Sequence, residues 1–188
     1  MTHIKNAKVL FLATNGFQED EMFSPHEELT QNGATVHLAS FDTDPISAGE
    51  GDSRKITPDM TFSDVNVSNY DALVLPGGVV NPDKLRTSQQ AVQIVRDFAK
   101  DGKVVAAICH GPWMLAEADI LRDRKATSYK SIKTDMMNAG AKWTDEPVVT
   151  DKGIITSRSP EDLEAFNAKI IEEIREGTHK RELKAKAA

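Results

Sequence analysis

Cys109 is the residue in this sequence best placed to do chemistry. It is the only cysteine among 188 residues, so it has no disulfide partner within the chain. It ends the apolar run Val104–Ile108 and is followed by His110, Gly111 and Pro112, which favour a sharp turn and a helix start. The first backbone N–H groups of that helix would stabilise a thiolate. The alternative is a buried structural cysteine. The strand-turn-helix pattern instead favours a nucleophile elbow with a reactive cysteine.

A cysteine nucleophile also needs a group that handles its proton and donors for a developing oxyanion. Lowering a thiol pKa from about 8.5 to about 5 takes roughly 5 kcal/mol, and one helix N-terminus supplies only about 0.3–2 kcal/mol. Further donors are therefore required. The backbone N–H groups of Gly78 and His110 are the candidates for an oxyanion hole, although Pro76-Gly77-Gly78 could equally be an ordinary turn.

Glu21 is the candidate acid. A carboxylate beside a thiolate is repulsive, so we expect a protonated Glu21 that donates a hydrogen bond to the sulfur. The alternative is an acid in a first helical turn that only complements the helix dipole. His110 is expected to point away from Cys109, because the two are adjacent on a sharp turn, and is not expected to be a simple base.

The sequence predicts no metal and no cofactor. It contains no cysteine and histidine set with zinc-ligand spacing and no glycine-rich phosphate loop. Four histidines have no partner that the sequence reveals, namely His3, His26, His37 and His179.

The elements that must position these residues alternate between strands and helices. Mostly unbroken apolar runs predict buried parallel strands, and helical periodicity with capping residues predicts the helices between them. Residues 40–70 are polar and predict an excursion with a hairpin, and Ser159 is the expected N-cap of the last helix. The predicted strands are 9–13, 34–39, 71–75, 104–108 and a hairpin of 148–151 with 153–157; the predicted helices are 20–31, 88–101, 131–138 and 159–176.

This order predicts an α/β fold, a three-layer flavodoxin-like sandwich around a central, mostly parallel sheet. Sites in such sheets lie beyond the carboxyl ends of the strands. Three candidate segments follow strand ends: residues 15–21, Gly77-Gly78 and Cys109-His110. Their convergence is the strongest argument for a site, because it depends on topology and not on any one motif.

Length and composition place limits on the partners. The 188 residues suit one domain, 1–188, with a frayed basic tail over 178–188. A net charge of −6 argues against a nucleic acid as the main partner. No apolar run approaches the roughly 20 residues that span a bilayer, and no signal peptide is recognised, so we expect a cytoplasmic protein.

Together these motifs resemble the PfpI intracellular protease family, within the class I glutamine amidotransferase-like superfamily that also holds the Parkinson-associated deglycase. The resemblance rests on the segments 17–21, 75–78, 107–112, 122–129, 138–141 and 156–163. It implies Cys109 as nucleophile, His110 as its neighbour, Glu21 as the acid at the thiol and Gly78 in the oxyanion hole. It also implies that Asp83 meets the histidine of a neighbouring subunit, and hence a homo-oligomer, a dimer or higher.

The resemblance implies a cytoplasmic stress-response cysteine hydrolase that acts on carbonyl groups. The leading hypothesis is deglycase or glyoxalase-type chemistry on glyoxal or methylglyoxal, with small carbonyl compounds or modified proteins and peptides as partners. One alternative is an intracellular cysteine peptidase, which would need His110 and Asp83 to protonate the leaving amine. Another, outside enzymes, is a redox-sensing or chaperone-like stress protein that uses the oxidisable Cys109.

Overall fold

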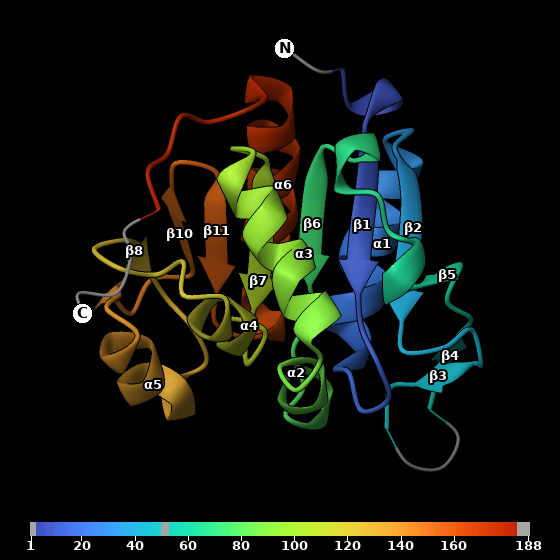
Figure 1. Ribbon diagram of the computed structural model, residues 1–188, viewed down its shortest axis with the longest axis horizontal. Coiled ribbons are helices and arrows are strands. Elements are labelled where there is room, and N and C mark those ends of the chain that lie inside the picture. The colour runs from blue at the N-terminus through green and yellow to red at the C-terminus, as the bar shows by residue number, and fades with distance from the viewer. Residues whose placement is uncertain (1–2, 50–52, 184–188) are drawn as a thin grey trace.

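The computed structural model describes residues 3–49 and 53–183, and its centre is a seven-stranded sheet (Figure 1). The strand order is β10-β11-β7-β6-β1-β2-β5, and every neighbouring pair is parallel except the β10–β11 hairpin. The strands are β1 (Lys8–Leu12), β2 (Thr35–Ser40), β5 (Met60–Thr61), β6 (Ala72–Leu75), β7 (Val104–Ile108), β10 (Val148–Asp151) and β11 (Ile154–Ser157). The predicted, mostly parallel sheet is confirmed.

Two hydrophobic cores lie on the two faces of this sheet, because side chains alternate along each strand. On β1, Val9 and Phe11 enter one core and Leu10 and Leu12 enter the other. The Val9 face is covered by α1 (Glu19–Gln31) and α6 (Leu163–Glu176). The opposite face, toward the viewer in Figure 1, carries α3 (Gln89–Lys100) and α4 (Trp113–Glu117). Helices α2 (Val80–Leu85) and α5 (Lys133–Asn138) contact α4 and lie below the strand ends in this view. The predicted three-layer sandwich is therefore present.

The excursion over residues 40–70 contains the predicted hairpin, formed by β3 (Ile46–Ser47) and β4 (Lys55–Ile56). The sequence analysis missed α2 and the parallel pair β8 (Lys125–Ala126) and β9 (Lys142–Trp143), because such short elements have no periodicity to detect. Single 3-10 turns occupy Ile4–Asn6, Phe62–Asp64, Val67–Asn69, Lys130–Ile132 and Pro160–Asp162.

The last helix begins differently from the prediction. Ser159 makes no capping hydrogen bond with its side chain, and a 3-10 turn over Pro160–Asp162 precedes α6. The carboxylate of Asp162 instead accepts two hydrogen bonds from the Arg158 guanidinium, at 2.9 and 3.0 Å. This charge-assisted pair ties the 3-10 turn to Arg158, and neither Ser159 nor Asp162 caps a helix N–H with its side chain.

The basic tail was predicted to fray from residue 178, and this is wrong for residues 178–183. The backbone N–H of His179 donates to Gly102 O at 2.7 Å, Arg181 Nη2 donates to Lys103 O at 2.5 Å, and Arg124 Nη2 donates to Glu182 O at 3.1 Å. These bonds hold the segment against the body of the protein. Residues 184–188 lie outside the described residues.

Three strand ends meet at one edge of the sheet, as predicted. Phe11, Val74 and Ala106 are in register across β1, β6 and β7. These parallel strands end one or two residues later, at Leu12, Leu75 and Ile108. The loops that follow them therefore begin at the same level of the sheet.

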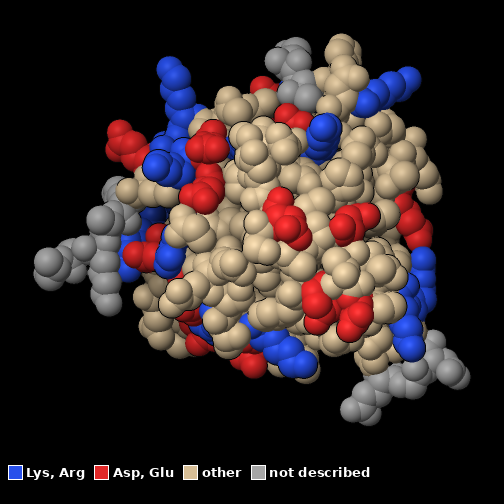
Figure 2. Space-filling view, turned by 45° about the vertical axis from the view of Figure 1, so that its right-hand side comes forward, with Lys and Arg blue, Asp and Glu red and all other residues tan. Residues whose placement is uncertain are grey.

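Charged side chains are unevenly spread over one face of the protein (Figure 2). The face in Figure 2 shows acidic side chains across its middle, with Lys and Arg gathered at its margins. On this face, Lys and Arg form no continuous basic track of the kind that binds a nucleic acid. Among the described residues, we find no helix with the length and apolar character to cross a bilayer.

Candidate active site

Cys109 occupies a left-handed backbone conformation directly after β7. Its φ is +62°, which costs a non-glycine residue roughly 1–3 kcal/mol and persists only where surrounding contacts hold it. The Cys109 N–H donates to Ser157 O at 3.1 Å, and Cys109 O accepts from the Tyr129 N–H at 2.8 Å. Gly111 is needed next, because a Cβ there would strike the backbone oxygens of Leu75 and Ile108. The predicted elbow is thus present, with α4 following it.

Glu21, in the first turn of α1, is completely buried beside Cys109. Its Oε2 accepts a hydrogen bond from Gly77 N at 2.8 Å, and its side chain contacts the thiol of Cys109. Its Oε1 has no nitrogen or oxygen partner among the described residues. The start of α1 is fixed by Gln18, whose Oε1 accepts from Glu21 N at 2.7 Å and whose N–H donates to Gly77 O at 3.2 Å. Glu21 is therefore more than a dipole complement.

The Gly77-Gly78 turn closes the site from β6. The Gly78 N–H points at the Cys109 sulfur, as does the N–H of His110, so both oxyanion-hole candidates face the same atom. Gly78 has a φ of +77°, and a Cβ on it would collide with Gly16 O and Gln18 N. Only glycine fits this close approach.

Asn81 braces the turn and was missed by the sequence analysis. It is fully buried, its Oδ1 accepts from Thr14 N at 2.8 Å, and its Nδ2 donates to Pro76 O and Gly77 O at 3.0 and 3.2 Å. It thus ties the end of β1 to the end of β6. An asparagine in a loop of turn-forming residues gives no signal that its amide reaches back across two strands.

His110 does not point away from Cys109, which corrects the expectation from sequence adjacency. Its Nδ1 lies 3.2 Å from the Cys109 sulfur, and its Nε2 lies 3.0 Å from Ser131 Oγ. The ring stacks on Tyr129, with centroids 4.9 Å apart at 27°, and meets Trp113 edge-on at 5.1 Å. Because φ is positive at Cys109, the backbone turns far enough to bring both side chains to one side.

Burial dominates the electrostatics of the site. It raises the pKa of Glu21 to about 7, against the opposing effect of the Gly77 hydrogen bond. Burial, and then the charge of Glu21, raise the pKa of the Cys109 thiol to about 12, although the N–H groups of Gly78 and His110 oppose the shift. Burial also lowers the pKa of His110.

The N–H groups at the sulfur lower the thiol pKa, in the direction expected from the sequence, but burial and the charge of Glu21 outweigh them. Helix α4 has only five residues, and the buried sulfur loses more solvation than the two N–H groups return. A thiol beside an ionised Glu21 and a thiolate beside a protonated Glu21 carry the same net charge. They differ by one proton transfer between the two side chains, so Glu21 remains the candidate proton carrier.

Asp83 is not brought to His110 within the protomer. It lies exposed on α2, while the Nε2 side of His110 is occupied by Ser131. Val79 and Val80, just before it, are 55% and 48% exposed, and Tyr129 on the His110 side is 42% exposed. No apolar stripe in the sequence predicts this rim of Val79, Val80 and Tyr129, which only the folded chain brings together.

The side chains around Cys109 supply one thiol, one carboxyl and one imidazole. They form no three-ligand metal cluster among residues 3–49 and 53–183, and the single such cluster lies at the end of α6. The arrangement suits nucleophilic addition to a carbonyl group, with two N–H donors for the oxygen and a proton carrier next to the sulfur.

Gly78→Ala should destabilise the protein by at least about 2 kcal/mol, because it combines a left-handed backbone with a backbone collision. The measurement is the free energy of unfolding in urea. Gly49→Ala is the matched control, since a Cβ there would meet only Ser53 Oγ at 3.8 Å. Equal effects of the two substitutions would contradict the close approach at Gly78.

As the pH rises from 5 to 8, the free energy of unfolding of the wild type should fall relative to that of Glu21→Gln. The folded-state pKa of Glu21 is raised from 4.5 to about 7, so the folded protein binds this proton more tightly than the unfolded chain. The stabilisation from this proton is fully present below the ordinary pKa of 4.5 and disappears as the pH rises through the folded-state pKa of about 7. The loss is at most about 3 kcal/mol. Urea unfolding at both pH values measures it. A difference that does not change with pH, as expected for exposed Glu164→Gln, would refute the shift.

Comparisons with known proteins agree with this geometry. Residues 7–173 match the family described as DJ-1/PfpI. The chain is 45% identical over 164 residues to Deglycase PH1704 of Pyrococcus horikoshii, covering 87% of this chain and 97% of that protein. It is 40% identical over 165 residues to Protein/nucleic acid deglycase 2 of Escherichia coli, covering 87% and 95%.

A solved structure is similar over the same region. It is a two-domain protein from Anabaena variabilis with DJ-1/ThiJ/PfpI-like and ferritin-like domains, 36% identical, with a TM-score of 0.87. The likeness covers 90% of this chain and 48% of that one. The family match over most of the chain and the identity to full-length relatives give one conclusion: this chain belongs to the DJ-1/PfpI family.

Proposed function

We propose that this protein is a Cys109-dependent hydrolase of the PfpI type that acts on glyoxal or methylglyoxal and on their adducts with proteins. Both of the relatives named above carry the name deglycase. The E. coli name also includes nucleic acid, but the net charge of −6 favours proteins and small carbonyl compounds as partners here. We further propose a cytoplasmic location, which suits an unpaired cysteine.

The reaction needs no cofactor. The sulfur forms a bond to the aldehyde carbon, the C=O π electrons move to oxygen, and the thiol proton ends on that oxygen to give a hemithioacetal. With an amine adduct, the C–N bond breaks instead and the amine leaves with the proton. A proton then moves from the sulfur-bearing carbon to the adjacent carbonyl carbon, and the hydroxyl proton on the first carbon passes to the oxygen of the second. The first carbon is oxidised to a thioester carbonyl and the second is reduced to an alcohol. Water cleaves the C–S bond, releasing a hydroxy acid and the thiol.

The buried Glu21 carboxyl beside the sulfur is the observation that carries this proposal. A proton carrier works best with a pKa near the operating pH, and burial raises the pKa of Glu21 to about 7. It can take the thiol proton when the sulfur adds and return it to oxygen or carbon. The N–H groups of Gly78 and His110 can bind the alkoxide oxygen as its charge develops.

Peptide hydrolysis is less well supported by the same geometry. It requires an acid that protonates a departing amine, and burial lowers the pKa of His110. Within the protomer, no carboxylate among the described residues contacts this imidazole, whose Nε2 bonds to Ser131. Redox sensing is also less favoured, because Cys109 is buried and oxidation of a thiol requires access to the sulfur.

We also propose a homo-oligomer in which Asp83 approaches the His110 of a neighbouring subunit. The exposed Val79 and Val80 beside Asp83 support it, since apolar side chains at the rim of a site are favourable to bury. In that assembly, Asp83 would help His110 to protonate a departing amine, which peptide hydrolysis requires and the conversion of an aldehyde to a hydroxy acid does not.

Cys109→Ser should lower methylglyoxal turnover by a factor on the order of 10³ or more, because no other group can form the thioester. Asp83→Ala should retain most of this activity, since the proton path runs through Glu21. The assay follows hydroxy-acid formation, with cleavage of a fluorogenic peptide measured in parallel. If Asp83→Ala lost both activities equally, or if peptide cleavage were the faster reaction, the aldehyde assignment would be wrong.

Ser131→Ala should lower kcat for methylglyoxal about tenfold with little change in KM, because the hydrogen bond to Nε2 that orients His110 is removed. Ser131→Thr keeps the hydroxyl and should restore most of the rate. Ser68→Ala, whose hydroxyl bonds to Asn66 far from the site, is the control. A Ser131→Ala variant with unchanged kcat would remove Ser131 from the positioning of His110.

A further inference from the structure

The segment after α6, residues 178–183, packs against two glycines of the protein body. Gly177 ends the helix with a φ of +93°, which reverses the chain and lets residues 178–183 return along the body of the protein. The backbone of His179 then bonds to Gly102, and a Cβ on Gly102 would strike His179 O. The His179 ring packs so closely on Gly153 that a Cβ there would strike Cδ2 of the ring.

This seat brings three potential ligands together. Glu173 and Glu176 lie one turn apart at the end of α6, and the reversal at Gly177 carries His179 back to them. One carboxylate oxygen of each glutamate and one ring nitrogen of the histidine all lie within 4.8 Å of one another. The sequence scan missed the set, because only the folded reversal gathers it.

The spacing within the cluster matches that of side chains that share one bound ion. Glu173 Oε2 and His179 Nε2 are 3.1 Å apart, and the two side chains are only 8% and 16% exposed. At that distance a hydrogen bond is expected, yet both atoms are buried without one, so the ring N–H direction does not point at the oxygen. Two ligands, each about 2.0–2.1 Å from one ion and about 90–110° apart, would lie about 2.9–3.4 Å from each other.

Neighbouring cations interact with Glu173 through space, but among the described residues none donates a hydrogen bond to its Oε2. The Lys169 ammonium forms an ion pair at 2.7 Å with Glu172, the residue before Glu173. Arg181 uses Nη2 to bond to Lys103 O, and its buried Nε and Nη1 have no hydrogen-bond partner among the described residues. A buried carboxylate without a hydrogen bond is costly, and a bound cation would remove that cost.

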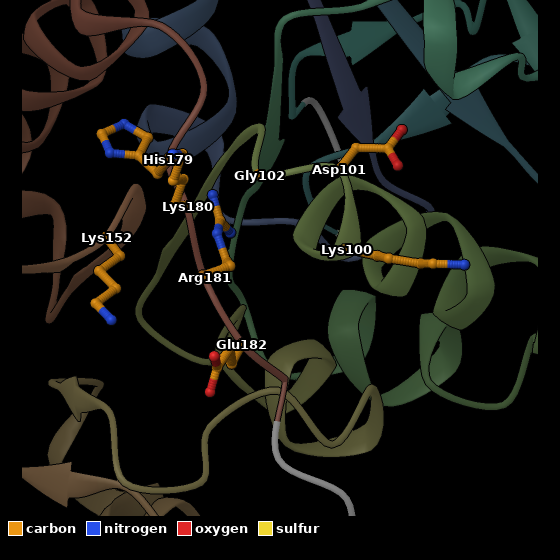
Figure 3. A pocket seen from close by; sticks show the side chains of 8 residues that line it. All are labelled: Lys100, Asp101, Gly102, Lys152, His179, Lys180, Arg181 and Glu182. Carbon is orange, nitrogen blue, oxygen red and sulfur yellow. The ribbon is translucent and has the colours of Figure 1, made fainter.

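The hollow along the segment shares His179 with the cluster but is lined by neither Glu173 nor Glu176. Figure 3 shows the segment passing Gly102, with the His179 ring on one side and Lys100 and Asp101 on the other. Lys100 and Lys152 lie on opposite sides of the segment and do not point toward one another, so they do not gather around one anion.

We propose that Glu173, Glu176 and His179 bind one divalent first-row transition metal ion, with Zn²⁺ as the reference ion, and that this ion fastens residues 178–183 to the end of α6. One imidazole and two carboxylates are a donor set for such ions and a poor one for Ca²⁺, which prefers six to eight oxygens. The family match ends at Glu173, so two of the three ligands lie beyond it.

The test is calorimetric titration of the full-length protein with Zn²⁺, in a Cys109→Ser background that removes the thiol as a competing ligand. We expect one ion per chain, with affinity at least about tenfold weaker in His179→Gln and in Glu176→Gln. Glu172→Gln and His3→Gln, exposed residues outside the cluster, are the matched controls and should bind like the parent. Glu176 is itself exposed, so its substitution should leave the fold intact.

Trypsin cleavage after Lys180 and Arg181 gives an independent measurement. Zn²⁺ should slow cleavage in the parent and not in His179→Gln, and EDTA should reverse the protection. No Zn²⁺ binding, or binding that neither ligand substitution weakens, would overturn the proposal. Equal protection of the segment with and without Zn²⁺ would also overturn it, because the Glu173–His179 pair alone would then hold the tail.

Discussion

Three backbone segments approach one sulfur atom with no space for side chains between them, and the rest of the site depends on this crowding. Gly77, Gly78 and Gly111 each lie where a Cβ would strike backbone or the reacting side chains. Only then can peptide N–H groups from two strand ends reach Cys109 while Glu21 enters from α1. The parallel register of β1, β6 and β7 sets the three segments at one level, and Asn81 keeps the ends of β1 and β6 together. The strained φ of Cys109 is sustained by the same packing.

The features that the sequence predicted correctly are those that local pattern determines. Continuous apolar runs predicted the buried strands, and the apolar run before Cys109 with Gly111 and Pro112 after it predicted the elbow. Topology then predicted that the strand ends would meet, which brings Glu21 and Gly78 to the sulfur of Cys109. Along the chain, Glu21 lies 57 residues before Gly78 and 88 residues before Cys109. These inferences needed only the periodicity of elements and the rule that parallel strands end at one edge.

The features that the sequence could not predict arise from contacts between distant residues. The direction of His110 depends on stacking with Tyr129 and a hydrogen bond to Ser131, which lie in a loop without periodicity. The raised pKa of Cys109 depends on how completely the folded chain excludes water, which a helix-dipole argument does not include. The packed tail depends on Gly102 and Gly153, whose free space accepts His179 and is visible only after folding.

The hydroxyl of Ser131 has a consequence that a carboxylate in its place would not have. A hydroxyl both donates and accepts, so it satisfies His110 Nε2 whichever ring nitrogen carries the hydrogen. Either tautomer of the neutral imidazole can therefore face the sulfur, with or without a hydrogen on Nδ1. Bond formation and bond release ask for opposite directions of hydrogen movement at the same sulfur. Within the protomer, the imidazole can meet both demands in one ring orientation, because Ser131 pairs with Nε2 in either tautomer.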